Sequence, residues 1–65
     1  MTDIEQSYAK TFRGSDGARV MAHLRDITIE RFLGPDATEA QLRALEGQRA
    51  LVHQMKALIE RGKNG

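Results

Sequence analysis

Apolar side chains recur every four residues near the start of the chain. The residues with this spacing are Ile4, Tyr8 and Phe12. A four-residue period predicts a helix with one apolar side, over about residues 3–13. Thr2 and Glu5 have the spacing of a capping box, in which each side chain binds the other residue's backbone N–H, and Gly14 is expected to end the helix. Because a helix of about three turns is only marginally stable alone, we expect it to dock on the rest of the chain.

The next stretch with a helical period, over about residues 16–33, carries apolar side chains on two sides. At 100° per residue the broader side holds Val20, Met21, Leu24, Ile27, Thr28 and Phe32, and the opposite side holds Ala22, Ile29 and Leu33. A helix with two apolar sides has two surfaces to bury. Either Ile29 and Leu33 contact another subunit, or the helix frays there and the turn at Gly34 and Pro35 covers them. Pro35 disfavours helical geometry at Gly34, so the helix is expected to end there.

A second capping box, Thr38 and Gln41, predicts a third helix over about residues 38–61 that Gly62 closes. Its apolar side chains spread over nearly half of the circumference: Leu42, Ala44, Leu45, Leu51, Val52, Met55, Leu58 and Ile59. This is more apolar surface than one short helix can cover. We therefore predict an all-α fold, a single domain over 1–65, in which the last two helices form an antiparallel hairpin and the short N-terminal helix packs across one end.

The chain is short, and its sequence offers neither the disulfides nor the metal site that usually stabilise small domains. It has 65 residues and no cysteine, and its two histidines, His23 and His53, lack the spacing of a metal site. Small domains of this kind usually complete their core with a partner or with further copies of themselves. We therefore expect a homo-oligomer or a protein-bound form, with no metal, no cofactor and no enzymatic activity.

The charges are balanced and mixed along the chain. Ten basic residues against nine acidic ones give a formal net charge of +1, without the basic cluster of a nucleic-acid-binding protein. The apolar runs are too short to span a bilayer, and the N-terminus lacks the basic start and apolar core of a signal peptide. These features predict a cytoplasmic protein without membrane contact.

A DNA-binding alternative stays open on size, because three helices in about 60 residues match a helix-turn-helix domain. The exposed side of the third predicted helix offers Arg43 and Arg61 to phosphate. Glu39, Glu46 and Glu60 share that side and would repel it. The pattern therefore disfavours a nucleic-acid partner.

Two residues interrupt the apolar side of the third predicted helix. Gln48 lies near its centre, where an amide either faces solvent through a gap in a small core or fixes the register of a helical assembly. Gly47 costs about 1 kcal/mol relative to alanine, so it is either a tolerated residue or a place where the first helix or another subunit approaches closely. The candidate interface residues are Ile29, Phe32, Leu33, Gly47, Gln48, Leu51, Met55 and Leu58.

Two motifs carry a resemblance to a known family. With x for any residue, they are Phe12-x-x-x-Asp16-Gly17-x-x-Val20-x-x-x-Leu24 and Glu46-Gly47-Gln48-Arg49-x-Leu51-Val52. From about Tyr8 to Gly62 the chain resembles a family of small tailed-phage proteins with relatives in phage-derived gene transfer agents. The loop over residues 33–38 is more similar to the gene-transfer-agent branch. Members of the family are usually encoded in the virion structural cluster, near terminase, portal and capsid genes.

The resemblance implies a role in virion assembly, DNA packaging or the head–tail connection, and it supplies no catalytic residues. Together with the surplus apolar surface, it predicts a small assembly or packaging factor that acts through protein–protein association. The expected partner is a further copy of the chain or a portal, terminase or capsid component. The alternatives are a regulatory inhibitor that docks on a host or phage enzyme, and a small-terminase-like subunit that binds DNA directly.

Overall fold

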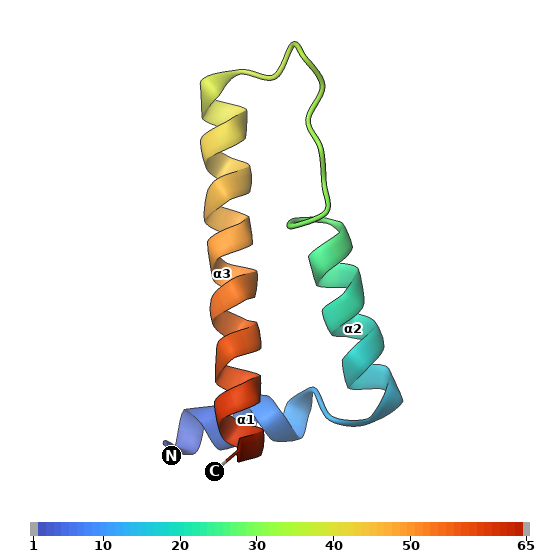
Figure 1. Ribbon diagram of the computed structural model, residues 1–65, viewed down its shortest axis with the longest axis vertical. Coiled ribbons are helices and arrows are strands. Elements are labelled where there is room, and N and C mark those ends of the chain that lie inside the picture. Colours follow the sequence, from blue (N-terminus) through green and yellow to red (C-terminus); the bar gives the residue numbers. More distant parts are fainter. Residues whose placement is uncertain (1, 65) are drawn as a thin grey trace.

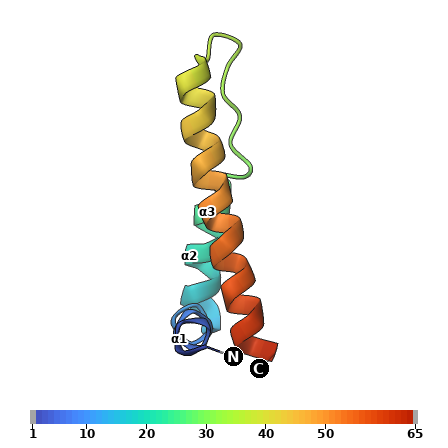
Figure 2. The same ribbon diagram turned by 90° about the vertical axis from the view of Figure 1, so that its left-hand side faces the viewer.

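The computed structural model describes residues 2–64 as three helices joined by two connections (Figure 1). The helices are α1 (Asp3–Thr11), α2 (Gly14–Asp26) and α3 (Glu39–Asn64). α2 and α3 run antiparallel, and α1 lies across the end of the hairpin at which α3 finishes; Figure 2 shows α1 end-on beside the last turns of α3. The described residues contain no strand, and the predicted all-α hairpin with a short N-terminal helix is confirmed.

The capping box predicted at the start of α1 is present. The Glu5 backbone N–H donates to the Thr2 hydroxyl at 3.2 Å, and the Thr2 backbone N–H donates to the Glu5 carboxylate at 3.0 Å. α1 ends at Thr11, slightly before the predicted end, and the Phe12 N–H donates the last hydrogen bond into it. Gly14 then opens α2 with a φ of +81°, a left-handed conformation that glycine adopts without strain. The glycine therefore forms the corner between the two helices.

α2 ends at Asp26, so the predicted helix over 16–33 is wrong at its C-terminal end. The residues after Asp26, 27–29, are all β-branched and have lower helix propensity than straight side chains. The Thr28 hydroxyl donates to the Leu24 carbonyl at 2.6 Å, and such side-chain bonds to a carbonyl one turn earlier destabilise and bend helices. The helical period of the sequence continues past this point, but the helix does not.

Arg49 of α3 holds the chain that follows α2 in its non-helical path. Its guanidinium donates from Nε to the Thr28 carbonyl at 2.9 Å and from Nη2 to the Arg31 carbonyl at 2.6 Å. Its third nitrogen, Nη1, pairs with Glu46 at 2.9 Å, which fixes the orientation of the guanidinium. A fork of donors with fixed geometry is well suited to hold two backbone carbonyls at once. The segment 27–38 is therefore clamped to α3 as an irregular connection.

Two glycines allow close backbone approaches at the base of the hairpin. A Cβ atom at Gly62 would overlap the Glu5 carbonyl oxygen, so the absent side chain lets α1 cross α3. A Cβ atom at Gly17 would overlap the backbone of Phe12 in the same way. Gly62 does not close α3, which runs past the predicted range 38–61 to Asn64.

The apolar core is small and lies along one line of α3. Leu45, Val52 and Ile59, spaced by seven residues, are the buried apolar side chains of the described region. The molecule measures 43 × 23 × 13 Å with a radius of gyration of 13.9 Å, against about 11 Å for a compact domain of this length. The fold is therefore thin and elongated. Within residues 2–64 no helix is long and apolar enough to cross a bilayer.

Candidate protein-interaction surface

One side of α3 carries no charged side chain over most of its length. At 100° per residue, seven side chains share an arc of about 100°: Ala40, Ala44, Gly47, Gln48, Leu51, Met55 and Leu58. We call these residues the uncharged face. It lies about a quarter-turn around the helix from the buried line of Leu45, Val52 and Ile59, and it includes five of the predicted interface residues.

The N-terminal half of the uncharged face is open. Leu51 is 57% exposed, and Ala44, Gly47 and Gln48 are also exposed. No described atom outside the local helix lies within 4 Å of a Cβ atom built on Gly47, so α1 does not approach it. The interpretation in which the first helix packs closely at Gly47 is therefore wrong, because α1 makes its close approach at Gly62.

The C-terminal half of the uncharged face meets α1, where Met55 and Leu58 are half-buried. An apolar groove of about 310 Å³ lies beside the crossing, lined by Ile4, Ser7, Tyr8, Thr11, Phe12 and Met55. The Tyr8 and Phe12 rings stack with their centroids 6.2 Å apart. α1 docks on α3, as expected for a short helix, but Ile4 stays 57% exposed, so part of the apolar stripe of α1 lines an open groove.

α1 is held in place by a buried carboxylate. Glu5 faces α3, and its Oε2 lies 3.4 Å from Nη1 of Arg61. The hydrogen bond from the Thr2 backbone N–H lowers the pKa of the Glu5 carboxyl, and the Arg61 charge adds to this effect, although burial of the carboxyl acts the other way. The carboxylate therefore stays ionised at neutral pH and joins the start of α1 to the end of α3.

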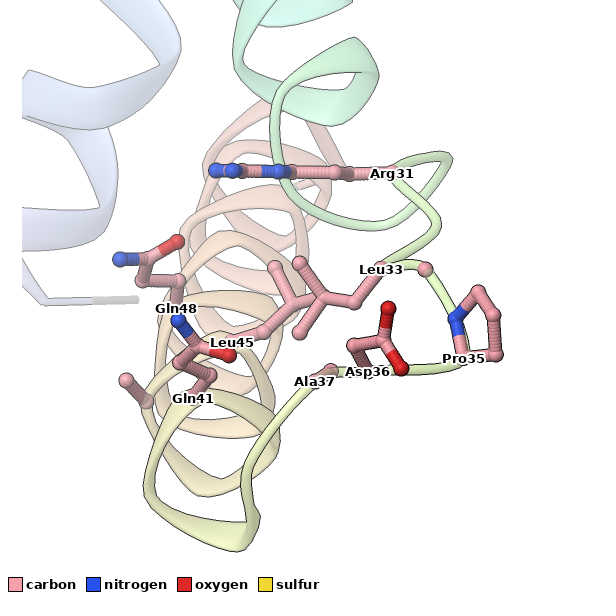
Figure 3. Close-up of a pocket in the computed structure, with 10 residues that line it drawn as sticks. Arg31, Leu33, Pro35, Asp36, Ala37, Gln41, Leu45 and Gln48 are labelled. Atoms are coloured by element: carbon pink, nitrogen blue, oxygen red, sulfur yellow. The ribbon is translucent and has the colours of Figure 1, made fainter.

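A cavity of about 440 Å³ lies between the loop after Arg31 and the first turns of α3 (Figure 3). Leu33 points toward Leu45 in this cavity, whereas Gln48 points away from the loop. Ala44 and Gln48 line the cavity too, so it opens beside the uncharged face. One predicted interface residue of the loop, Leu33, and one of α3, Gln48, therefore line the same cavity.

The three predicted interface residues that precede the third helix lie on the loop and not on a helix. Ile29 and Leu33 are half-buried, and Phe32 is 91% exposed. The predicted second helical side with Ile29 and Leu33 does not form, because α2 ends before either residue. Of the two alternatives, a helix that does not extend through these residues is the one closer to the structure. Phe32 nevertheless leaves a large aromatic side chain in solvent next to the cavity.

Two contributors to this surface were missed by sequence reasoning. Arg49 positions the loop and hence the cavity, and its signal was Glu46 three residues earlier, at the spacing of a helical ion pair. The groove beside α1 depends on which side of α1 turns toward Gly62. That choice arises from a contact between the two ends of the chain and has no local signal.

Half of the ten basic side chains form ion pairs with acids. The ion pairs are Arg25–Glu30, Arg43–Glu39, Arg49–Glu46, Arg61–Glu5 and Lys63–Glu60, at 2.9–4.0 Å. No group of three or more potential metal ligands comes together among residues 2–64. The surface that remains distinctive is therefore the uncharged one.

A family model described as Bbp19-like phage protein matches residues 8–60 of the chain. The matched range covers α2, the loop and the whole uncharged face, and it begins within α1. Comparisons with curated proteins and with solved structures give no match.

Proposed function

The chain belongs to the Bbp19-like phage protein family, and we propose that it is a small virion assembly or DNA-packaging accessory protein. It acts by helix-mediated association with other proteins and not by catalysis. Its partners are further copies of itself, or a portal, terminase or capsid component of a tailed phage or a related gene transfer agent. It works in the host cytoplasm or on the virion.

The observation that carries this proposal is surplus accessible surface. The chain exposes 4934 Å², whereas a compact monomer of its mass of 7.3 kDa exposes about 4,200 Å². The surplus of roughly 700–800 Å² is close to the ~800 Å² that each partner buries in a standard protein interface. An elongated chain with this surplus gains its missing burial when a partner covers it.

The chemistry of the open surface favours a protein as that partner. Leu51 on the uncharged face, and Ile4 and Phe32 outside it, expose apolar area to solvent. Burial of apolar area is the main driving force of protein association. Nucleic-acid binding needs unmatched basic side chains, and the five ion pairs use half of the ten basic residues. The DNA-binding alternative is therefore the weaker one.

Size-exclusion chromatography with light scattering, over a range of protein concentrations, tests the proposal together with co-purification on tagged portal, terminase and capsid proteins. Leu51→Asp is expected to lower the assembly state or the capture, while helicity is retained because Leu51 is largely exposed. His53→Asp is the matched control, because His53 is exposed on the opposite side of α3.

A wild-type chain that is monomeric throughout and binds none of these proteins would refute the proposal. Selective capture of a host or phage enzyme with loss of that enzyme's activity would favour the regulatory inhibitor. Retention on duplex DNA that falls steeply with salt would favour the terminase-like subunit.

A further inference from the structure

When two copies of the uncharged face run in opposite directions, the sizes of their side chains are complementary. Ala44 and Leu51 lie at equal distances on either side of the midpoint between Gly47 and Gln48, and so do Ala40 and Met55. In two antiparallel copies of α3 crossing at this midpoint, each small residue is opposite a large one. The pattern matches two-fold packing, in which the same surface on both subunits must fit itself.

We propose that the occupant of the uncharged face is a second copy of this chain, packed with its α3 antiparallel and with the two-fold axis between Gly47 and Gln48. Leu51 of each protomer then lies over Ala44 of the partner subunit. This inference rests on the proposed function and deepens it, since it identifies the first partner and the geometry of contact.

The charge distribution distinguishes a second copy from a charged ligand. A charged partner finds no opposite charge along the uncharged face, whereas two such faces meet without any like-charge repulsion. Gly47 has open space in front of it and allows two helix backbones to approach closely at the crossing. The Gln48 amide both donates and accepts hydrogen bonds, so two copies related by a two-fold axis can satisfy each other.

The surroundings of the face limit where the crossing can lie. α1 crosses α3 at Gly62, and Met55 and Leu58 are half-buried beside it, which leaves the stretch from Ala40 to Leu51 exposed. The Gly47–Gln48 midpoint lies within that exposed stretch.

Both hollows beside the face are then filled. The partner's Ala40 and its neighbouring turn lie over Met55, against the apolar groove that Ile4 and Tyr8 line. The partner's Leu51 lies at the mouth of the cavity that Ala44 and Leu33 line. The roughly 700–800 Å² of surplus surface matches what one such interface removes from each protomer.

Single cysteines test this geometry directly, because the chain has none of its own. In the antiparallel pair, two copies of Ala44→Cys place their cysteines about 10 Å apart along the axis, and so do two copies of Leu51→Cys. Disulfides need Cα atoms within about 7 Å, so neither variant cross-links with itself. An equimolar mixture of the two variants brings Cys at 44 against Cys at 51 and forms the disulfide on mild oxidation.

His53→Cys, on the opposite side of α3, is the control for random collisions. Cross-linking in the mixture alone supports the proposal. Efficient self-cross-linking of Ala44→Cys and Leu51→Cys indicates a parallel pair and overturns it, and equal cross-linking of His53→Cys overturns it as well.

Light scattering separates this inference from the proposed function. A wild-type chain that stays monomeric but co-purifies with portal, terminase or capsid protein overturns the second copy as occupant and leaves the proposed function standing. Gly47→Leu adds bulk at the crossing, where a Cβ atom meets nothing within 4 Å, so it is expected to weaken self-association about tenfold or more without loss of helicity. Unchanged self-association of this variant also overturns the proposed crossing.

Discussion

Replacing Arg49 by alanine should destabilise the chain more than any other change of one surface charge. The substitution removes two charged hydrogen bonds to backbone carbonyls, of Thr28 and Arg31, and the ion pair to Glu46. A hydrogen bond to a charged group contributes about 1.5–3 kcal/mol, and water replaces part of this because the Arg49 side chain is 27% exposed. The expected loss is about 2–3 kcal/mol, a large share of the roughly 3–10 kcal/mol typical of a domain this size.

Urea or thermal unfolding followed by circular dichroism, at one fixed protein concentration, measures this loss. The melting temperature should fall by about 10–20 °C. Arg43→Ala is the matched control, because Arg43 is on the same helix and forms an exposed ion pair with Glu39, worth a few tenths of a kcal/mol. If the Arg49→Ala and Arg43→Ala variants have the same melting temperature, the loop is held by its apolar contacts, and the hydrogen bonds of Arg49 do not stabilise the fold.

Three further outcomes follow from the packing of the helices. Gly62→Ala should lower the melting temperature despite alanine's higher helix propensity, because its Cβ overlaps the Glu5 carbonyl. Gly47→Ala should instead raise monomer stability by up to about 1 kcal/mol. Equal effects of the two substitutions in thermal melts would contradict the α1 crossing. Glu5→Gln should destabilise the fold at neutral pH. Because the pKa of Glu5 is lowered in the folded chain, its ionised carboxylate contributes stability above its ordinary pKa of 4.5, and this stability is lost as the pH falls through the folded value. The unfolding curves of wild type and variant should therefore converge in acid. Phe32→Ser should leave the melting temperature unchanged, since the side chain is 91% exposed, and a clear fall in thermal melts would place it in an intramolecular contact.

The features that sequence reasoning predicted correctly are those encoded within a few residues. Both capping boxes form, since each depends on two side chains three positions apart. Leu45, Val52 and Ile59 are buried members of the broad apolar side predicted for the third helix, although the sequence did not distinguish them from its exposed members. The order of three helices and the antiparallel hairpin follow from such local signals and from the turn at Gly34 and Pro35.

The end of α2 could not be predicted, because the competing interaction comes from far along the chain. The residues 27–33 continue a helical period; the Thr28 side chain weakens the helix locally, and the Arg49 guanidinium, 21 residues beyond Thr28, binds that carbonyl outside a helix. The error matters for function, since it places Ile29 and Leu33 on a loop beside α3 instead of on a second helical side. The crossing at Gly62 is of the same kind, because its partner Glu5 is at the other end of the chain.

The short stretch from Glu46 to Arg49 contains two residues that serve the fold and two that do not. Glu46 and Arg49 form the clamp, whereas a Cβ atom at Gly47 would meet nothing within 4 Å and the Gln48 side chain points away from the loop. A glycine inside a helix costs about 1 kcal/mol, and this chain has few buried apolar groups to offset that cost. Nothing within the monomer accounts for Gly47, and the proposed two-fold crossing would give this glycine a role, because it needs a close approach of two backbones at that position.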